Sequence, residues 1–223
     1  MHDSDSFISE VSEEVRRDRF YATLRRYRWL LAAVVLLIVG GAAGNAWWKA
    51  HREARAEAAG DALRAAYAET DPATRAGMLG DLSAAEPGAG VVARLAQAGS
   101  LAEAGDTEQA AAILEDVAGD GNASQLYRSL ASLQRVMLLG AAMPSSERQA
   151  TLELLSAPDA PFRPLALEQR ALMHLDAGDK DKAIADLNAV LAEPGATEAL
   201  RGRAQQLLIA AGGSLPAAAS ADG

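Results

Sequence analysis

The stretch LAEAGDTEQAAAIL, residues 101–114, decides the fold, because a second version of it follows as HLDAGDKDKAIADL at residues 174–187. The offset between the copies, from position 101 to position 174, corresponds to two helical hairpins of about 34 residues each, plus a few inserted residues. A further hairpin is therefore predicted between the copies, formed by residues 126–139 and 148–155, with residues 140–145 as its turn.

Both copies contain the residue types that a helix–turn–helix requires. Glycine adopts the left-handed conformation that ends the first helix, and the aspartate after it is a preferred N-cap of the second. An alanine four residues after the aspartate lets the second helix lie close against the first, and the leucine one turn further on faces the core. These residues are Gly105, Asp106, Ala110 and Leu114 in the first copy, and Gly178, Asp179, Ala183 and Leu187 in the second.

The composition predicts an all-α fold. Aromatic residues make up 4% of the 223 residues, alanine is abundant, and no long alternating run of β-branched residues occurs, so helix propensity is high and strand propensity is low. Further helices are predicted at residues 73–85 and 197–211. Cysteine is absent from the sequence, which excludes disulfides, thiolate metal sites and cysteine nucleophiles.

A single transmembrane helix is predicted at residues 29–48. This stretch contains no charged residue, and as a helix it would be about 30 Å long, the thickness of a hydrocarbon core. Trp29 at one end and Trp47 and Trp48 at the other occupy the positions that aromatic residues take at membrane interfaces. The prediction is an uncleaved anchor that continues into the first helix of the soluble part.

Two alternatives to the anchor remain. A buried core helix is usually shorter and amphipathic, whereas this stretch is apolar on every face. A cleavable signal peptide is the other alternative, since Gly44 and Ala46 are small residues of the kind that signal peptidase accepts. The segment before the apolar run is long for the start of a signal peptide, which favours the anchor.

The basic residues around the anchor predict its orientation. Loops that stay in the cytoplasm contain an excess of Lys and Arg close to the membrane. Three basic residues follow the helix, Lys49, Arg52 and Arg55, and six precede it: Arg16, Arg17, Arg19, Arg25, Arg26 and Arg28. We therefore predict a cytoplasmic N-terminus and a soluble part on the other side of the membrane.

The chain is predicted to contain one folded soluble unit beside the anchor. The cytoplasmic segment begins with about ten disordered residues, and residues 11–27 form either an amphipathic helix on the inner membrane surface or a solvated, arginine-rich flank. The predicted parts are a cytoplasmic segment at 1–28, the transmembrane helix at 29–48, a repeat domain at 49–211 and a disordered tail at 212–223.

Charge and motifs exclude several classes of function. The formal net charge is −9, and residues 49–223 contain 15 basic and 24 acidic residues, which argues against a nucleic-acid partner. No nucleophile elbow, phosphate-binding loop, zinc-protease motif or nucleotide fingerprint occurs. The histidines, His2, His51 and His174, are scattered along the sequence. We expect no catalysis, no metal, no cofactor and no small-molecule substrate.

The repeated stretch resembles the tetratricopeptide-repeat family. That family has a small residue near the turn, a Gly-Asp-x-x-x-Ala motif and a downstream proline, and here the two copies described above match, with Pro194 after the second. Most of the aromatic positions of the family's first helix are missing, and residues 126–155 match only by their period. The resemblance implies a stack of helical hairpins that binds other proteins.

The order of the parts resembles a more specific family. A basic N-terminus, one anchor, Trp-Trp-Lys after the anchor and an alanine-rich, degenerate repeat domain are similar to the YfgM-like ancillary subunit of the bacterial Sec translocon. That resemblance implies a single-pass inner-membrane protein with a periplasmic repeat domain. It also implies two partners, the SecYEG channel and a membrane-anchored periplasmic chaperone.

Protein binding through the repeat domain is the function that the sequence favours. Stacked hairpins form a curved solenoid whose inner groove holds a peptide or a partner helix. Because the first helix of each hairpin lines that groove, its polar residues are the candidate contacts: Arg94, Gln97, Gln125, Arg128, Gln134, Arg135, Gln169 and Arg170. The alternatives are a scaffold or assembly factor of another envelope complex, without clients, and a stress-signalling role through residues 1–27.

Overall fold

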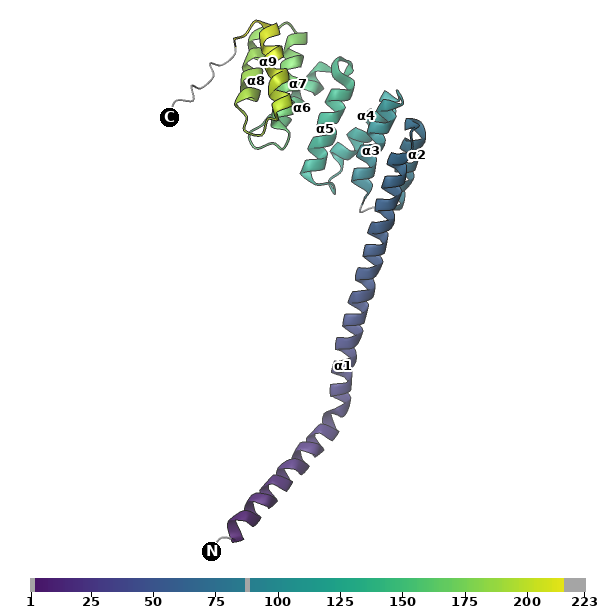
Figure 1. Ribbon diagram of the computed structural model, residues 1–223, viewed down its shortest axis with the longest axis vertical. Coiled ribbons are helices and arrows are strands. Elements are labelled where there is room, and N and C mark those ends of the chain that lie inside the picture. The colour runs from purple at the N-terminus through teal and green to yellow at the C-terminus, as the bar shows by residue number, and fades with distance from the viewer. Residues whose placement is uncertain (1–2, 87–88, 215–223) are drawn as a thin grey trace, which may run out of the picture. The chain divides into compact units, whose positions relative to one another are not determined.

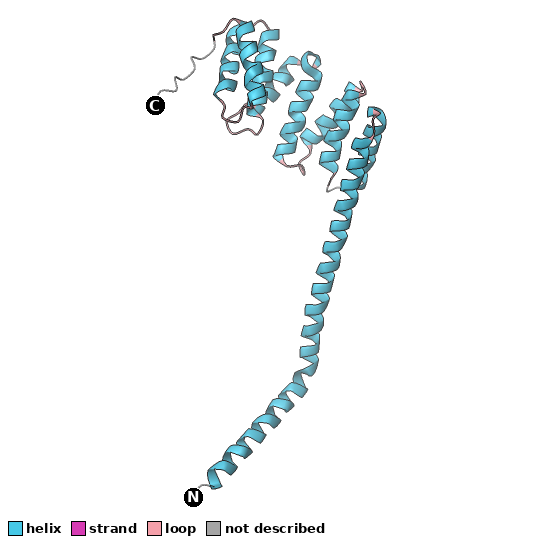
Figure 2. Cartoon of the chain, viewed as in Figure 1, coloured by secondary structure: helices cyan, strands magenta, loops and turns pink. Residues whose placement is uncertain are grey.

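The computed structural model describes the backbone of residues 3–86 and 89–214 and the side chains of residues 29–30, 32–86 and 89–214. All regular structure in these residues is helical, as Figure 2 shows, which confirms the all-α prediction. The helices are α1 (Asp3–Ala68), α2 (Pro72–Ala85), α3 (Gly90–Glu103), α4 (Thr107–Gly119), α5 (Gln125–Leu139), a 3₁₀ helix η1 (Gly140–Ala142), α6 (Ser145–Leu155), α7 (Arg163–Asp176), α8 (Lys180–Ala192) and α9 (Glu198–Ala211).

Helix α1 runs without interruption through the predicted anchor and into the soluble part. Its first residue is Asp3, although the sequence was expected to be disordered up to residue 10. Residues 4–10 contain neither proline nor glycine, so no residue in this stretch breaks a helix. The chain divides into two compact units between Glu57 and Ala58. The side chains that decide whether residues 11–27 are amphipathic lie outside the described residues.

Within the described residues, α1 is the one helix long and apolar enough to cross a membrane. The described side chains from Trp29 to Trp48 are all exposed, as a lipid-facing helix requires. At the end of the apolar stretch, the ring of Trp47 stacks on His51 with 5.6 Å between centroids, and the Arg52 guanidinium lies 4.9 Å from the Trp48 ring. Such amphipathic contacts are typical of residues at headgroup depth.

Helices α2 to α9 pack in chain order, as Figure 1 shows. Helices α3 and α4 form one hairpin, α5 and α6 the next, and α7 and α8 the third, each packed against its chain neighbour. The predicted middle hairpin is confirmed, with its turn formed by η1 and the residues that follow. The predicted helices at 73–85 and 197–211 are confirmed to within one residue at each end.

Two blocks of nearly equal length make up the domain from α2 to α9. The offset that relates Leu101 to His174 also relates both ends of α3 to those of α7, both ends of α4 to those of α8, and the starts of α2 and α5 to those of α6 and α9. We call α2–α5 the first block and α6–α9 the second block, and residues related by this offset are called equivalent. The repeat visible as two short stretches of sequence therefore extends over both blocks.

A continuous hydrophobic core joins the two blocks. One cluster packs between α2 and α5, a second between α5 and α7, and a third between α7 and α9. Helix α5 contributes Ala131 to the first cluster and Leu133 to the second, and α7 contributes Met173 to the second and Leu167 to the third. Shared helices of this kind make the stability of each hairpin depend on its neighbours.

Helix α9 ends the stack. Its Ile209 is 58% exposed, whereas the equivalent Val136 of α5 is buried against the following hairpin. Gln205 and Arg203 are exposed on the same helix, so its outer face is mainly polar, as a terminal repeat requires. Gly212 ends the helix in the left-handed conformation, with φ of 92°. Most of the predicted disordered tail, residues 215–223, lies outside the described residues.

Candidate protein-binding site

The turns of the two copies have the predicted geometry. Gly105 and Gly178 have φ of 86° and 77°, a conformation that costs a residue with a Cβ about 1–2 kcal/mol. Ala110 and Ala183 are fully buried between the helices of their hairpins. Each glycine thus lies in the turn of its hairpin, and each alanine lies where the two helices pack.

The predicted role of the two aspartates as N-caps is wrong in one respect. Asp106 and Asp179 occupy the N-cap positions of α4 and α8, but neither side chain accepts a hydrogen bond from a backbone N–H of the helix. Their ψ angles, 61° and 73°, differ from those of the extended backbone that aims an N-cap side chain at the helix. The carboxylates instead accept from side chains three residues on, Gln109 at 2.8 Å and Lys182 at 2.5 Å.

Other helices have conventional caps. Ser124 accepts a hydrogen bond from the backbone N–H of Tyr127, and Thr197 accepts one from that of Leu200. The two cap residues are equivalent positions of the first and second blocks. Helices α5 and α9 therefore begin in the same way, which keeps the two blocks in register.

The predicted groove residues all lie on the first helices of hairpins, as expected. Arg94 and Gln97 belong to α3, Gln125, Arg128, Gln134 and Arg135 to α5, and Gln169 and Arg170 to α7. Gln125 is exposed, and the other seven are partly buried. Their role in binding stays a prediction.

The four arginines of this set form contacts within the chain. Arg94 donates to the Asp120 carboxylate at 2.6 Å, and Arg128 donates to the carbonyl of Ala123. Arg135 bridges Glu115 of α4 and Glu147 of α6. The Arg135 bridge joins consecutive hairpins, the Arg94 bond closes the α3–α4 hairpin, and the Arg128 bond holds the start of α5. The structure therefore gives these arginines a stabilising role that the sequence did not indicate.

Arg170 is the centre of the most extensive polar cluster among the described residues of α6, α7 and α8. Its Nε and NH2 groups donate to the two oxygens of Asp186, and its NH1 donates to Ser156 Oγ at 2.6 Å. Asp186 is buried, and the Nε2 atom of His174 lies 3.7 Å from it. The hydrogen bonds to Asp186 raise the pKa of Arg170, so the guanidinium stays charged.

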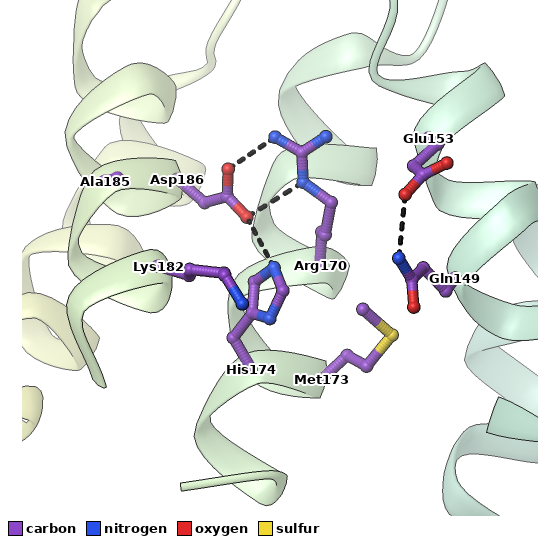
Figure 3. Close-up of a pocket in the computed structure, with 8 residues that line it drawn as sticks. All are labelled: Gln149, Glu153, Arg170, Met173, His174, Lys182, Ala185 and Asp186. Atoms are coloured by element: carbon purple, nitrogen blue, oxygen red, sulfur yellow. Dashed lines mark hydrogen bonds and ion pairs between the residues drawn. The ribbon is translucent and has the colours of Figure 1, made fainter. Parts of the chain in front are cut away.

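A pocket of about 350 Å³ opens beside this cluster. Figure 3 shows Arg170, His174 and Lys182 gathered around Asp186 on one side, with Gln149 and Glu153 of α6 on the other. The complete lining is Gln149, Glu153, Arg170, Met173, His174, Lys182, Ala185 and Asp186. The Gln149 side chain donates to the Glu153 carboxylate at 2.9 Å.

Lys182 of this pocket is paired with a carboxylate at the turn before α8. A hydrogen bond from Lys182 holds the pKa of Asp179 below its ordinary value, and the same contact raises the pKa of Lys182. Both groups are therefore charged at neutral pH. Among the side chains that the structure describes, no group of three His, Asp or Glu residues is arranged to hold a metal ion.

Sequence reasoning missed Asp186 and Ser156 and assigned no role to His174. A signal for two of them existed in the repeat. Asp186 corresponds to Ile113 of the first block, and His174 corresponds to Leu101. Charged or ionisable residues in place of apolar ones at core-facing positions indicate a local polar site.

A second hollow, of about 560 Å³, lies in the first block. It is bounded by α2, by the start of α3 and by the connection between α4 and α5. Its lining consists of Ser83, Gly90, Val91, Arg94, Asp120 and Asn122. The Arg94–Asp120 ion pair forms one wall.

A family model described as a tetratricopeptide repeat-like domain matches residues 22–208. The chain belongs to this family. The match begins before Trp29, so this tetratricopeptide repeat-like protein has its predicted anchor inside the region that defines the family. Comparison with curated proteins and with solved structures gave no match.

Membership explains why the pockets lie between neighbouring helices. Tetratricopeptide repeat-like domains are typically non-enzymatic modules that bind proteins. Stacked hairpins leave furrows between neighbouring helices, where side chains of a partner can insert. The protein is therefore an interaction module, and both hollows are candidate contact points for its partners.

Proposed function

We propose that this protein is a membrane-anchored, periplasmic protein-binding module, a YfgM-like ancillary subunit of the Sec translocon that cooperates with a membrane-anchored periplasmic chaperone. The proposal rests on the fact that the predicted anchor and the repeats belong to one family region, since one family match covers residues 22–208. In addition, α1 continues from the apolar stretch to Ala68 without a break. The domain is thereby tied to the surface at which secreted chains emerge.

Tethering supports this function physically. A domain held at the membrane meets chains emerging there at a high effective concentration, so modest affinity is sufficient. The anchor is proposed to have its N-terminus in the cytoplasm, since six arginines precede it and three basic residues follow. The excess of acidic over basic residues after position 48 favours partners with basic surfaces.

Co-purification from detergent-solubilised membranes tests the proposal. The full chain should recover SecYEG and a membrane-anchored chaperone, and crosslinking in cells should join its repeat domain to newly secreted proteins. The matched control is the chain without residues 1–48, which should lose these partners while its helices α2 to α9 stay folded.

The same experiment identifies the alternative functions. Recovery of an unrelated envelope complex without crosslinks to secreted chains would overturn the proposal and favour a scaffold. Loss of every partner on deletion of residues 1–15, with the arginines kept, would instead favour signalling through the cytoplasmic segment.

A further inference from the structure

One pair of equivalent positions differs between the blocks: the residue is an arginine in the second block and a glycine in the first. In the second block Arg163, the first residue of α7, extends over the end of α6. Its Nε donates to the Glu193 carboxylate at 2.5 Å, and its NH1 donates to the carbonyl of Ser156. Arg163 and Glu193 are both largely buried, with about a quarter of each side chain exposed. The arginine therefore fills the space between α6, α7 and the end of α8.

In the first block the equivalent of Arg163 is Gly90, which has no side chain to fill that space. The acceptors are nevertheless preserved, because Ser83 corresponds to Ser156 and Asp120 corresponds to Glu193. These residues line the 560 Å³ hollow together with Gly90. The hollow therefore occupies the place that an arginine side chain fills in the second block.

The carbonyl of Ser83 is suited to accept a bond from outside the helix. It belongs to the last turn of α2, where carbonyls have no partner within the helix. The residue four positions on, which would have to supply a helical N–H, is Pro87, and proline has no N–H. In the second block, the equivalent carbonyl is satisfied by the guanidinium of Arg163.

The Asp120 carboxylate keeps capacity for a further donor. Its Oδ2 accepts from Arg94, which lies one turn after Gly90 on α3, and its Oδ1 accepts from the backbone N–H of Asn122 at 2.9 Å. Each carboxylate oxygen can accept two hydrogen bonds, so the planar fork of a second guanidinium can reach the group beside Arg94.

We propose that this hollow receives the arginine side chain of a partner protein, which takes the place that Arg163 occupies in the second block. The guanidinium donates to the Ser83 carbonyl and to the Asp120 carboxylate, and its aliphatic stem lies along Val91. An arginine fits better than a lysine, because two acceptors at different places require a fork of donors rather than one point charge. The inference rests on the proposed function and deepens it by naming what the partner presents.

Gly90→Arg is the decisive variant, because the second block provides its template. A Cβ at Gly90 would lie 3.3 Å from the Ser83 carbonyl oxygen, so a shift of a few tenths of an ångström suffices. The new arginine should close the hollow from within. The matched control is Gly99→Arg on the same helix, where an added Cβ meets nothing within 4 Å and the charge change is the same.

The probe is the peptide acetyl-Gly-Gly-Arg-Gly-Gly-amide, compared with the same peptide containing citrulline, the uncharged analogue of arginine. Since the chain has no cysteine, Gly121→Cys in the full chain in detergent provides a single site for an environment-sensitive fluorophore near the hollow. Gly121 is exposed, does not line the hollow, and has open space for an added Cβ, with nothing within 4 Å. The arginine peptide should give a saturable change, and the citrulline peptide should bind about tenfold more weakly, as expected for loss of a charge-assisted hydrogen bond.

Gly90→Arg should abolish the saturable change, and Gly99→Arg should leave it intact. Asp120→Asn should weaken binding of the arginine peptide about tenfold. If Gly90→Arg does not fold, the titration of Asp120→Asn tests the inference by itself. Equal binding of the two peptides, or binding that survives both Gly90→Arg and Asp120→Asn, would overturn the inference. Failure of the proposed function can be told apart from failure of this inference. The first appears as absence of translocon partners in the co-purification, and the second appears only in the peptide titration.

Discussion

The guanidinium of Arg170 makes a two-pronged contact with the carboxylate of Asp186, at 2.9 Å from Nε to Oδ2 and 2.5 Å from NH2 to Oδ1. The equivalent residues of the first block are Gln97 and Ile113, which are uncharged. Both blocks nevertheless have the same helices in the same register. The ion pair is therefore a specialisation of the second block rather than a requirement of the repeat.

Breaking this pair from one side should destabilise the domain. Arg170→Gln leaves the buried carboxylate of Asp186 without its main partner, which should lower the free energy of unfolding by about 3 kcal/mol. Replacing both residues by their first-block equivalents, Arg170→Gln with Asp186→Ile, should restore most of that loss, because no buried charge is left unpaired. Urea denaturation followed by circular dichroism measures both variants.

The double variant is the control for the single one. If Arg170→Gln and Asp186→Ile destabilised the domain additively, the two side chains would act independently and the pairing described here would be contradicted.

The turn glycines give a second prediction. Gly178→Ala forces an alanine to adopt a φ of 77° and should lower the free energy of unfolding by about 1 kcal/mol. Gly99→Ala, inside α3 and with open space around the added methyl group, should raise it by about 0.5 kcal/mol. The urea midpoint should therefore fall for Gly178→Ala and rise for Gly99→Ala. If both variants shifted the midpoint equally, the left-handed conformation of Gly178 would not be the cause of the destabilisation.

Much of the fold could be predicted from the sequence, because local chemistry decides it. Pro72 starts α2, Gly105 and Gly178 end helices in the left-handed conformation, and buried alanines at Ala110 and Ala183 set the hairpins. Each of these features depends on one or two neighbouring residues. The hairpin turns and the start of α2 followed from them, whereas the start of α1 at Asp3 did not.

The candidate site could be predicted only in part, because its contacts join residues far apart in the sequence. Arg170 was a candidate, but its partner Asp186 lies 16 residues away on another helix, and a charged residue on an alanine-rich helix is usually solvated. The equivalence of Gly90 with Arg163 was also hidden. The two positions lie outside the repeated stretch and differ in side chain, and the coinciding ends of α3 and α7 show that the offset extends to them.

The Arg94–Asp120 pair predicts a pH dependence. The hydrogen bond from Arg94, together with that from the Asn122 N–H, holds the pKa of Asp120 below its ordinary value of 3.8. Because the pKa is lower in the folded state than in the unfolded state, the stabilisation is complete above pH 3.8 and is lost as the pH falls through the folded pKa. Asp120→Asn should therefore be less stable than the unaltered protein at pH 6, with the gap closing in acid.

Urea midpoints between pH 6 and pH 3 measure this difference. Arg94→Gln removes the hydrogen-bond donor, so the urea midpoint of this variant should fall less steeply with falling pH than that of the unaltered protein. A gap between Asp120→Asn and the unaltered protein that stayed constant over the whole range would mean that the ion pair does not stabilise the folded state.

Anchoring with the repeat domain outside the cytoplasm is tested most directly by cysteine accessibility in spheroplasts of a bacterial host. The chain contains no cysteine, so single substitutions report on one position each. Asn122→Cys, exposed in the repeat domain, should react with a membrane-impermeant maleimide in intact spheroplasts, and Ser4→Cys should react only after lysis. Labelling of Ser4→Cys with protection of Asn122→Cys would contradict the orientation, and with it the proposal that the domain meets secreted chains.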